Sequence, residues 1–229
     1  MNPLSKFRIP IMLGLLLGAA SLALVRGREQ TPAADKALQE LKAGNDHHVN
    51  HRYTHPHETP MRQHELAGGQ NPHAVILGCA DSRVPPEIIF DQGLGDLFTV
   101  RVAGNVAGVN ELASIEYAVE HLHTPLLVVM GHQKCGAVSA AVEGGEASGH
   151  LPELIKAIQP AVEKAKGMPG DVIENAVRSN VEMVVQQLST SQPVLAPLVN
   201  EDKLRIVGAV YSLDTGKVTW LPETAEKTH

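Results

Sequence analysis

Four short apolar segments constrain the fold of this chain more than any other feature of its sequence. They are residues 74–78 (AVILG), 97–102 (LFTVRV), 125–130 (PLLVVM) and 204–211 (LRIVGAVY). Continuous apolar runs of this length are typical of strands that are covered on both faces, as in parallel sheets. Helical spacing fills much of the intervening chain, over about 35–50, 110–121, 135–142, 151–166 and 171–188. This alternation predicts an α/β fold with a central, largely parallel β-sheet flanked by helices.

Composition limits the class of protein further. The chain has 229 residues, 43% of them hydrophobic and 19% charged, which is enough for one sizeable core and argues against disorder. The formal net charge of −6 argues against a nucleic-acid partner, which requires a basic face. Two cysteines are too few for a fold that depends on disulfides. We predict a single domain over residues 35–229.

The first 26 residues have the layout of a secretory signal peptide. Lys6 and Arg8 precede an apolar run over 9–25 that ends in small residues. This run is shorter than the roughly 20 residues needed to span a bilayer, which favours a cleaved signal over an uncleaved anchor. Its only charged residues are Lys6, Arg8 and Arg26, so removing it changes the formal charge from −6 to −9. We expect export to a bacterial periplasm, a spacer over 27–34, and no stable membrane insertion after cleavage.

Cysteine and histidine side chains follow two of the predicted strands. Cys79 comes directly after the strand at 74–78, and His132 and Cys135 follow the strand at 125–130. Functional residues of such sheets gather beyond the carboxyl ends of the strands, where these three side chains can reach one point. Thiolate and imidazole are zinc ligands, and three of them leave one tetrahedral position open, as in catalytic sites. Three alternatives remain open: a disulfide between the cysteines, buried core thiols, and a hydrogen-bonded core histidine.

Asp81 and Arg83 form a second candidate group beside the presumed metal. A carboxylate two residues from a zinc cysteine is either a ligand or an acceptor for a group bound to the metal. The guanidinium of Arg83 is always charged and can pair with Asp81 through two hydrogen bonds. Such a pair keeps Asp81 ionised and holds it off the metal. The alternative is an ordinary surface ion pair of little energetic value.

Four motifs in a fixed order give the chain a resemblance to the β-class carbonic anhydrases, over about residues 70–142. These motifs are Cys79-Ala-Asp81-Ser82-Arg83-Val-Pro, Arg101-Val-Ala-Gly-Asn105, Ile115-Glu-Tyr117-Ala-Val and Gly131-His132-x-x-Cys135-Gly136. The resemblance implies one Zn²⁺ per chain on Cys79, His132 and Cys135, with Asp81 and Arg83 as a catalytic dyad. It implies reversible hydration of carbon dioxide to bicarbonate, with zinc-bound hydroxide as the nucleophile.

The family has an open form and a closed form, and Asp81 is a fourth zinc ligand only in the closed one. Members of the open form resemble this chain at Gln70, a polar contact to bicarbonate, and at Phe98 and Tyr117, which line the substrate pocket. The backbone at Gly136 is also implied to steady bicarbonate. The resemblance therefore favours the open form. The family builds its pocket across a dimer interface, with the N-terminal helix embracing the partner, so we expect a homodimer or a dimer of dimers.

Two other functions remain open at this point. Hydrolases of carbon disulfide or carbonyl sulfide resemble the same zinc site. A non-catalytic zinc-binding protein is suggested by a histidine-rich segment, because seven of the twelve histidines lie between His47 and His73. The irregular spacing of these histidines favours a solvated, buffering surface over a metal site.

Overall fold

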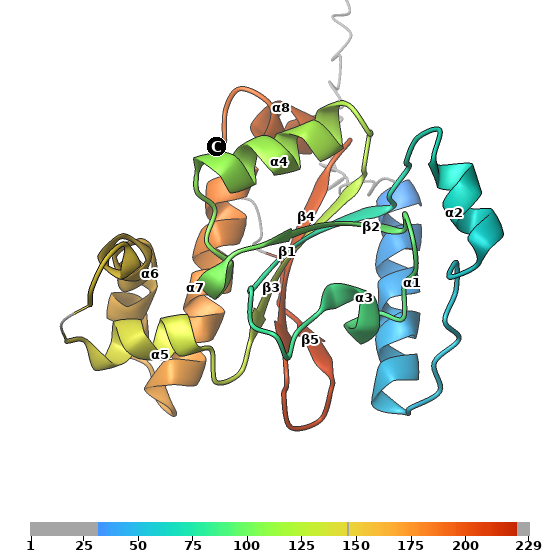
Figure 1. Cartoon of the computed structure of the whole chain (residues 1–229). Coiled ribbons are helices and arrows are strands. Elements are labelled where there is room, and N and C mark those ends of the chain that lie inside the picture. The colour runs from blue at the N-terminus through green and yellow to red at the C-terminus, as the bar shows by residue number, and fades with distance from the viewer. Residues whose placement is uncertain (1–31, 146, 224–229) are drawn as a thin grey trace, which may run out of the picture.

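A five-stranded sheet lies at the centre of the structure, a computed structural model that describes residues 32–145 and 147–223 (Figure 1). Its strands are β1 (Ala74–Gly78), β2 (Leu97–Arg101), β3 (Leu126–His132), β4 (Arg205–Tyr211) and β5 (Val218–Trp220). Their order is β2-β1-β3-β4-β5, with β5 antiparallel to β4 and the other pairs parallel. Every residue of β1 and β3 is buried, as continuous apolar runs predict. The predicted α/β fold is confirmed.

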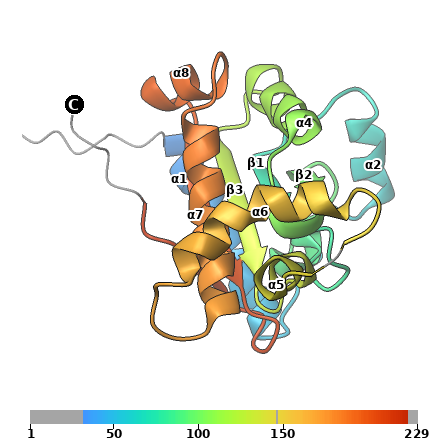
Figure 2. The same cartoon turned by 90° about the vertical axis from the view of Figure 1, so that its left-hand side faces the viewer.

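Helices cover both faces of this sheet, so its apolar side chains fall into two cores. Side chains of α1 (Pro32–Val49) and α3 (Pro86–Ile89) pack with Ile76 and Val128 on one face. Side chains of α4 (Val109–Glu120), α7 (Val172–Ser189) and α8 (Leu195–Asn200) pack with Val75 and Leu127 on the other. The helices α5 (Gly136–Glu143) and α6 (Leu151–Ala165) pack beside α7 (Figure 2). Neighbouring residues of one strand thus face opposite cores.

The order of the strands reverses at the carboxyl ends of β1 and β3. Both β2 and β3 pair with β1, one on each side, so the chain leaves β1 and β3 in different directions. Ligand sites in open α/β sheets lie at such a reversal of strand order. Cys79 directly follows β1, and His132 is the last residue of β3. The fold therefore brings the predicted ligands to one edge of the sheet.

Three short helices and the start of α4 differ from the sequence-based expectation. The sequence predicts a loop over 45–73, where α2 (Pro60–Leu66) lies, and it does not predict α3 or α8. These helices have seven, four and six residues, too few for an apolar stripe at helical spacing to be recognised. Asn110 is not the cap of α4: the helix begins at Val109, and the Glu111 carboxylate accepts a hydrogen bond from Gly108 N–H.

The N-terminal helix begins inside the segment predicted as a spacer. Residues 1–26, the predicted signal peptide, and 27–31 lie outside the described residues, but α1 starts at Pro32. Proline suits the first turn of a helix, because its fixed φ is helical and its missing N–H needs no partner there. Ala34, Ala37, Leu38 and Leu41 are buried, so α1 packs against the sheet of its own chain. No helix among the described residues is long and apolar enough to span a membrane.

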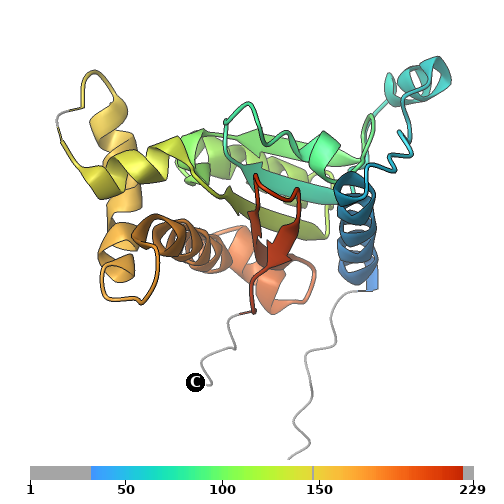
Figure 3. The same ribbon diagram turned by 90° about the horizontal axis from the view of Figure 1, so that it is seen from below.

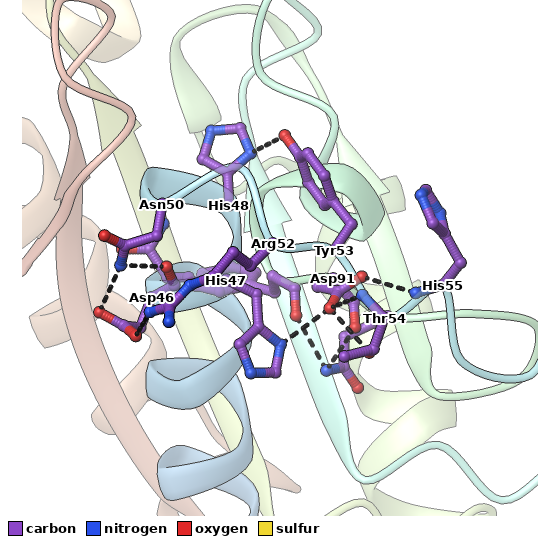
Figure 4. A network of polar contacts seen from close by, with 12 residues as sticks. Asp46, His47, His48, Asn50, Arg52, Tyr53, Thr54, His55 and Asp91 are labelled. Atoms are coloured by element: carbon purple, nitrogen blue, oxygen red, sulfur yellow. Dashed lines mark hydrogen bonds and ion pairs between the residues drawn. The ribbon is translucent and has the colours of Figure 1, made fainter.

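The histidine-rich segment is partly a structural network and only partly a solvated surface. Asp91, nearly buried, accepts hydrogen bonds from the N–H groups of Thr54 and His55 and pairs with the His47 ring (Figure 4). The ring of His48 lies between the hydroxyl groups of Tyr53 and Tyr211. These contacts fix the chain that follows α1. Beyond them, α2 buries none of its residues and projects from the body (Figure 3).

Candidate metal centre

Cys79, His132 and Cys135 converge at the carboxyl ends of β1 and β3. Their side chains are 4%, 1% and 1% exposed, and their potential ligand atoms all lie within 4.8 Å of one another. They are the one group of three or more potential metal ligands that the structure brings together within residues 32–145 and 147–223. The two Sγ atoms are 3.9 Å apart and both cysteines are free thiols, so the structure contradicts the disulfide alternative.

The geometry of the group fits a tetrahedral zinc ion. Two sulfurs that each lie about 2.3 Å from a zinc ion are about 3.8 Å apart at the tetrahedral angle. The Nδ1 atom of His132 is 2.8 Å from the carbonyl oxygen of Gln133, which assigns the ring proton to Nδ1. The Nε2 atom of His132 is buried without a hydrogen-bond partner. A buried nitrogen lone pair beside two sulfurs is the arrangement expected of a metal ligand, and it argues against a hydrogen-bonded core histidine.

Hydrogen bonds favour thiolate at Cys79. The Cys135 thiol makes the largest contribution, and with the backbone at Asp81 and Gly104 it lowers the pKa of Cys79 to about 4 despite burial. The hydrogen bond to Cys79, and then burial, raise the pKa of Cys135. Cys135 is the N-cap residue of α5, where the backbone at Val138 and Ala137 opposes this rise in its pKa. The surroundings therefore favour a thiolate at Cys79.

Asp81 and Arg83 form the pair that the sequence predicts. Arg83 donates from Nε to Asp81 Oδ1 at 2.9 Å and from Nη2 to Oδ2 at 2.6 Å, and its backbone N–H donates to Oδ1. These bonds hold the pKa of Asp81 well below its usual range. Asp81 Oδ2 lies 3.8 Å from His132 Nε2, so the carboxylate is beside the metal group. This is a bidentate pair at the site and not an isolated surface contact.

Arg101 and Gly104 support the ligand loop, a role that the sequence reasoning missed. Arg101 donates from Nε to the carbonyl of Cys79 at 2.9 Å and from Nη2 to the carbonyl of Asp81. Gly104, in the 3₁₀ turn η1 (Ala103–Asn105), donates its N–H to Cys79 Sγ at 3.3 Å. Both residues belong to a motif on which the resemblance rests, and that motif was the available signal. The spacing of the motif residues does not predict which atoms Arg101 and Gly104 contact.

The residues predicted to contact substrate lie in two places. Gly136 follows Cys135 directly, and the space beside its Cα is open. Phe98 pairs in register with Val75, near the start of β1, and its ring centroid is 6.2 Å from that of Tyr117 on α4. Gln70 is exposed and precedes β1, whereas Cys79 follows it. Within one chain, Gln70, Phe98 and Tyr117 are therefore near the end of β1 opposite to the metal group.

Comparison with known proteins agrees with this site. The family model described as carbonic anhydrase matches residues 74–218. Carbonic anhydrase 2 of Mycobacterium tuberculosis is 40% identical over 185 residues, which cover 79% of this chain and 89% of the relative. Among solved structures, a β-carbonic anhydrase of Sordaria macrospora has a TM-score of 0.66 and 26% identity, covering 81% of this chain and 97% of the other. This chain belongs to the β-carbonic anhydrase family.

Further β-carbonic anhydrase relatives agree in sequence and in fold. The carbonic anhydrase of Mycolicibacterium smegmatis is 38% identical over 186 residues, covering 80% of this chain and 90% of the relative. A β-carbonic anhydrase of Aspergillus fumigatus has a TM-score of 0.64 at 30% identity, covering 84% and 92% of the two chains. The Sordaria macrospora protein is described as tetrameric. The family and the enzyme class predicted from the sequence are confirmed.

Proposed function

We propose that this β-carbonic anhydrase catalyses the reversible hydration of carbon dioxide to bicarbonate and a proton, with one zinc ion on Cys79, His132 and Cys135. The convergence of three buried ligands next to the ionised Asp81–Arg83 pair is the observation that carries the proposal. In such a site zinc supplies a nucleophilic water whose pKa is lowered to about 7. With three protein ligands, Cys79, His132 and Cys135, one position would be left for that water.

Asp81 would orient the nucleophile. Its carboxylate is ionised and is held by Arg83, so it accepts hydrogen bonds and donates none. From its position 3.8 Å from His132 Nε2, it can accept a hydrogen bond from a water beside the ligands and direct the oxygen lone pair at carbon dioxide. The pairing of both carboxylate oxygens with Arg83 supports the open form of the site, in which Asp81 is not a ligand.

Gln70, Phe98 and Tyr117 would complete the substrate pocket from a second copy of the chain. They are near the opposite end of β1 from Cys79, so one chain does not place them at its own metal group. A two-fold axis that places the start of β1 of each chain beside the metal group of the other chain would bring the groups together twice. We therefore propose a homodimer or a dimer of dimers. Sedimentation of a monomer at micromolar concentration would contradict this assembly.

The decisive experiment is stopped-flow measurement of carbon dioxide hydration by the wild-type protein and the Asp81→Asn variant. We expect activity in the wild type, with one zinc per chain by elemental analysis, and a loss of about 10²-fold or more in the variant. Carbon disulfide and carbonyl sulfide are assayed in parallel. Hydrolysis of these compounds without hydration of carbon dioxide would replace the proposal by the hydrolase alternative. One bound zinc with no activity on any of the three would indicate a non-catalytic zinc-binding protein.

We also propose that the protein is exported to a bacterial periplasm. The proposal rests on the basic residues and apolar run of the first 26 residues. Cell fractionation and mass determination of the mature N-terminus test it. An intact Met1 in a cytoplasmic fraction would refute cleavage and export.

A further inference from the structure

Asn180 is a polar residue in an apolar part of the molecule. It lies on α7, is 0% exposed, and is followed by the buried Val181. Its Nδ2 atom donates a hydrogen bond of 2.8 Å to the carbonyl oxygen of Gly104, and its Oδ1 atom is buried without a partner. An unpaired buried amide oxygen destabilises a fold. Only one of the two polar atoms of the Asn180 side chain has a hydrogen-bond partner. Fold stability alone is therefore a weak reason for an amide at this position.

The partner of Asn180 is the turn that contacts the metal group. Gly104 donates its own N–H to Cys79 Sγ at 3.3 Å, in a buried environment. Its φ is +69°, and that of Asn105 is +44°, so two successive residues are in the left-handed region. A Cβ at residue 104 would lie 2.7 Å from Ile158 Cδ1, so the turn also packs closely against α6. Such a turn keeps its conformation only when neighbouring groups fix it.

The two hydrogen bonds act on opposite sides of the Gly104 Cα atom. The N–H that contacts Cys79 belongs to the peptide group that joins residues 103 and 104, and the carbonyl held by Asn180 belongs to the next peptide group. Asn180 therefore restrains the second peptide group, and only the φ and ψ rotations of Gly104 separate that group from the N–H that contacts Cys79. We propose that Asn180 is a positioning residue that keeps the Gly104 N–H directed at the Cys79 sulfur. This inference rests on the proposed zinc site.

Hydrogen bonds from outer residues to metal-bound groups tune metal retention. An amide N–H that points at a thiolate stabilises its negative charge, and loss of an outer partner of a metal ligand typically lowers metal affinity 10–100-fold. If Asn180 only satisfied a buried carbonyl, its loss would lower fold stability and leave the sulfur environment unchanged. The two roles therefore differ in the properties of the bound metal and not in the melting temperature.

The test compares Asn180→Leu, which removes the donor at similar volume, with Leu188→Ala on the same helix. Leu188 is 0% exposed and packs in the core away from the ligands, so its truncation weakens the fold without touching Gly104. Both variants are purified with zinc, and release of the metal to a chromophoric chelator is timed. The cobalt-substituted proteins are then compared by their thiolate-to-cobalt charge-transfer absorption. Asn180→Ser replaces Asn180→Leu if the latter does not fold.

We expect the Asn180 variant to release zinc about ten-fold faster than the wild type and to shift the charge-transfer band. Leu188→Ala is expected to lower the melting temperature while keeping the wild-type release rate and spectrum. Release within two-fold of wild type from a folded Asn180 variant would overturn the inference, as would equal release from both variants. If the wild-type protein retains no zinc, the proposed function fails and the inference fails with it. If the wild-type protein retains zinc and the Asn180 variant releases it at the wild-type rate, the inference alone fails.

Discussion

His132 and most of the histidines between residues 47 and 73 have the same side chain in different environments. His132 is 1% exposed, and its Nε2 is buried without a protein partner beside two sulfurs. In the histidine-rich segment, His51, His55, His57 and His64 are exposed. The rings of His47 and His57 pair with the carboxylates of Asp91 and Asp96, and that of His48 bonds to tyrosine hydroxyl groups. The number of histidines is therefore a poor guide to a metal site, whereas convergence of unpartnered atoms is a good one.

The strongest test of this comparison makes the same substitution in both groups. We expect His132→Gln to reduce bound zinc from one per chain to nearly none. Carbon dioxide hydration should fall by more than about 10³-fold, because the metal supplies the water of low pKa. The combined variant His51→Gln, His55→Gln and His64→Gln should keep one zinc and the wild-type rate. Elemental analysis and stopped-flow assays measure both, and loss of zinc from the combined variant would contradict the distinction.

A second test concerns the structural role of the histidine-rich segment. Asp91→Ala removes a buried carboxylate that accepts from two backbone N–H groups and the Thr54 hydroxyl and pairs with the His47 ring. We expect the free energy of unfolding to fall by about 2–4 kcal/mol and the melting temperature by roughly 5–15 °C. Zinc content should stay at one per chain.

The matched control for Asp91 is Asp46→Ala. Asp46 is 65% exposed and pairs with Arg52 at 3.7 Å, so its loss should change the free energy of unfolding by less than about 1 kcal/mol. Thermal denaturation of both variants, followed by circular dichroism, gives the comparison. Equal melting temperatures for the two would show that the network around Asp91 does not hold the segment in place.

The smallest expected effect is a pH dependence through His48. Burial, followed by the nearby charge of His51, lowers the pKa of His48 below 6.5. The unfolded chain therefore takes up this proton first, and stability is lost as pH falls from about 6.5 toward the folded pKa. His48→Gln keeps a side chain that can bond to the tyrosines but cannot titrate. The variant should lose less stability than the wild type between pH 7.5 and 5.5 in urea titrations, and an identical loss would remove His48 from the explanation.

The sequence predicts the strands and the ligand group because both depend on local pattern. Apolar runs identify β1 and β3, and residues at their ends must share one edge of the sheet. Contacts between segments far apart in sequence are not available from such patterns. Asp91 binding the chain after α1 is one case, and Arg101 holding the Cys79 carbonyl is another. The same limit applies to Gln70, Phe98 and Tyr117, whose separation from Cys79 appears only once β1 and β2 are in register.

The strand ends that carry the sulfurs are also distant along the chain. Cys79 and Cys135 are 56 residues apart, and α3, β2, α4 and β3 lie between them. A zinc ion bound to both would act as a cross-link across this loop, and a covalent link closing a loop of that length removes about 4 kcal/mol of chain entropy from the unfolded state. A disulfide gives such a restraint only where the surroundings are oxidising. A metal cross-link requires the thiols to be reduced when the metal binds, but it does not depend on an oxidant afterwards. The same restraint therefore persists in a reducing or an oxidising compartment.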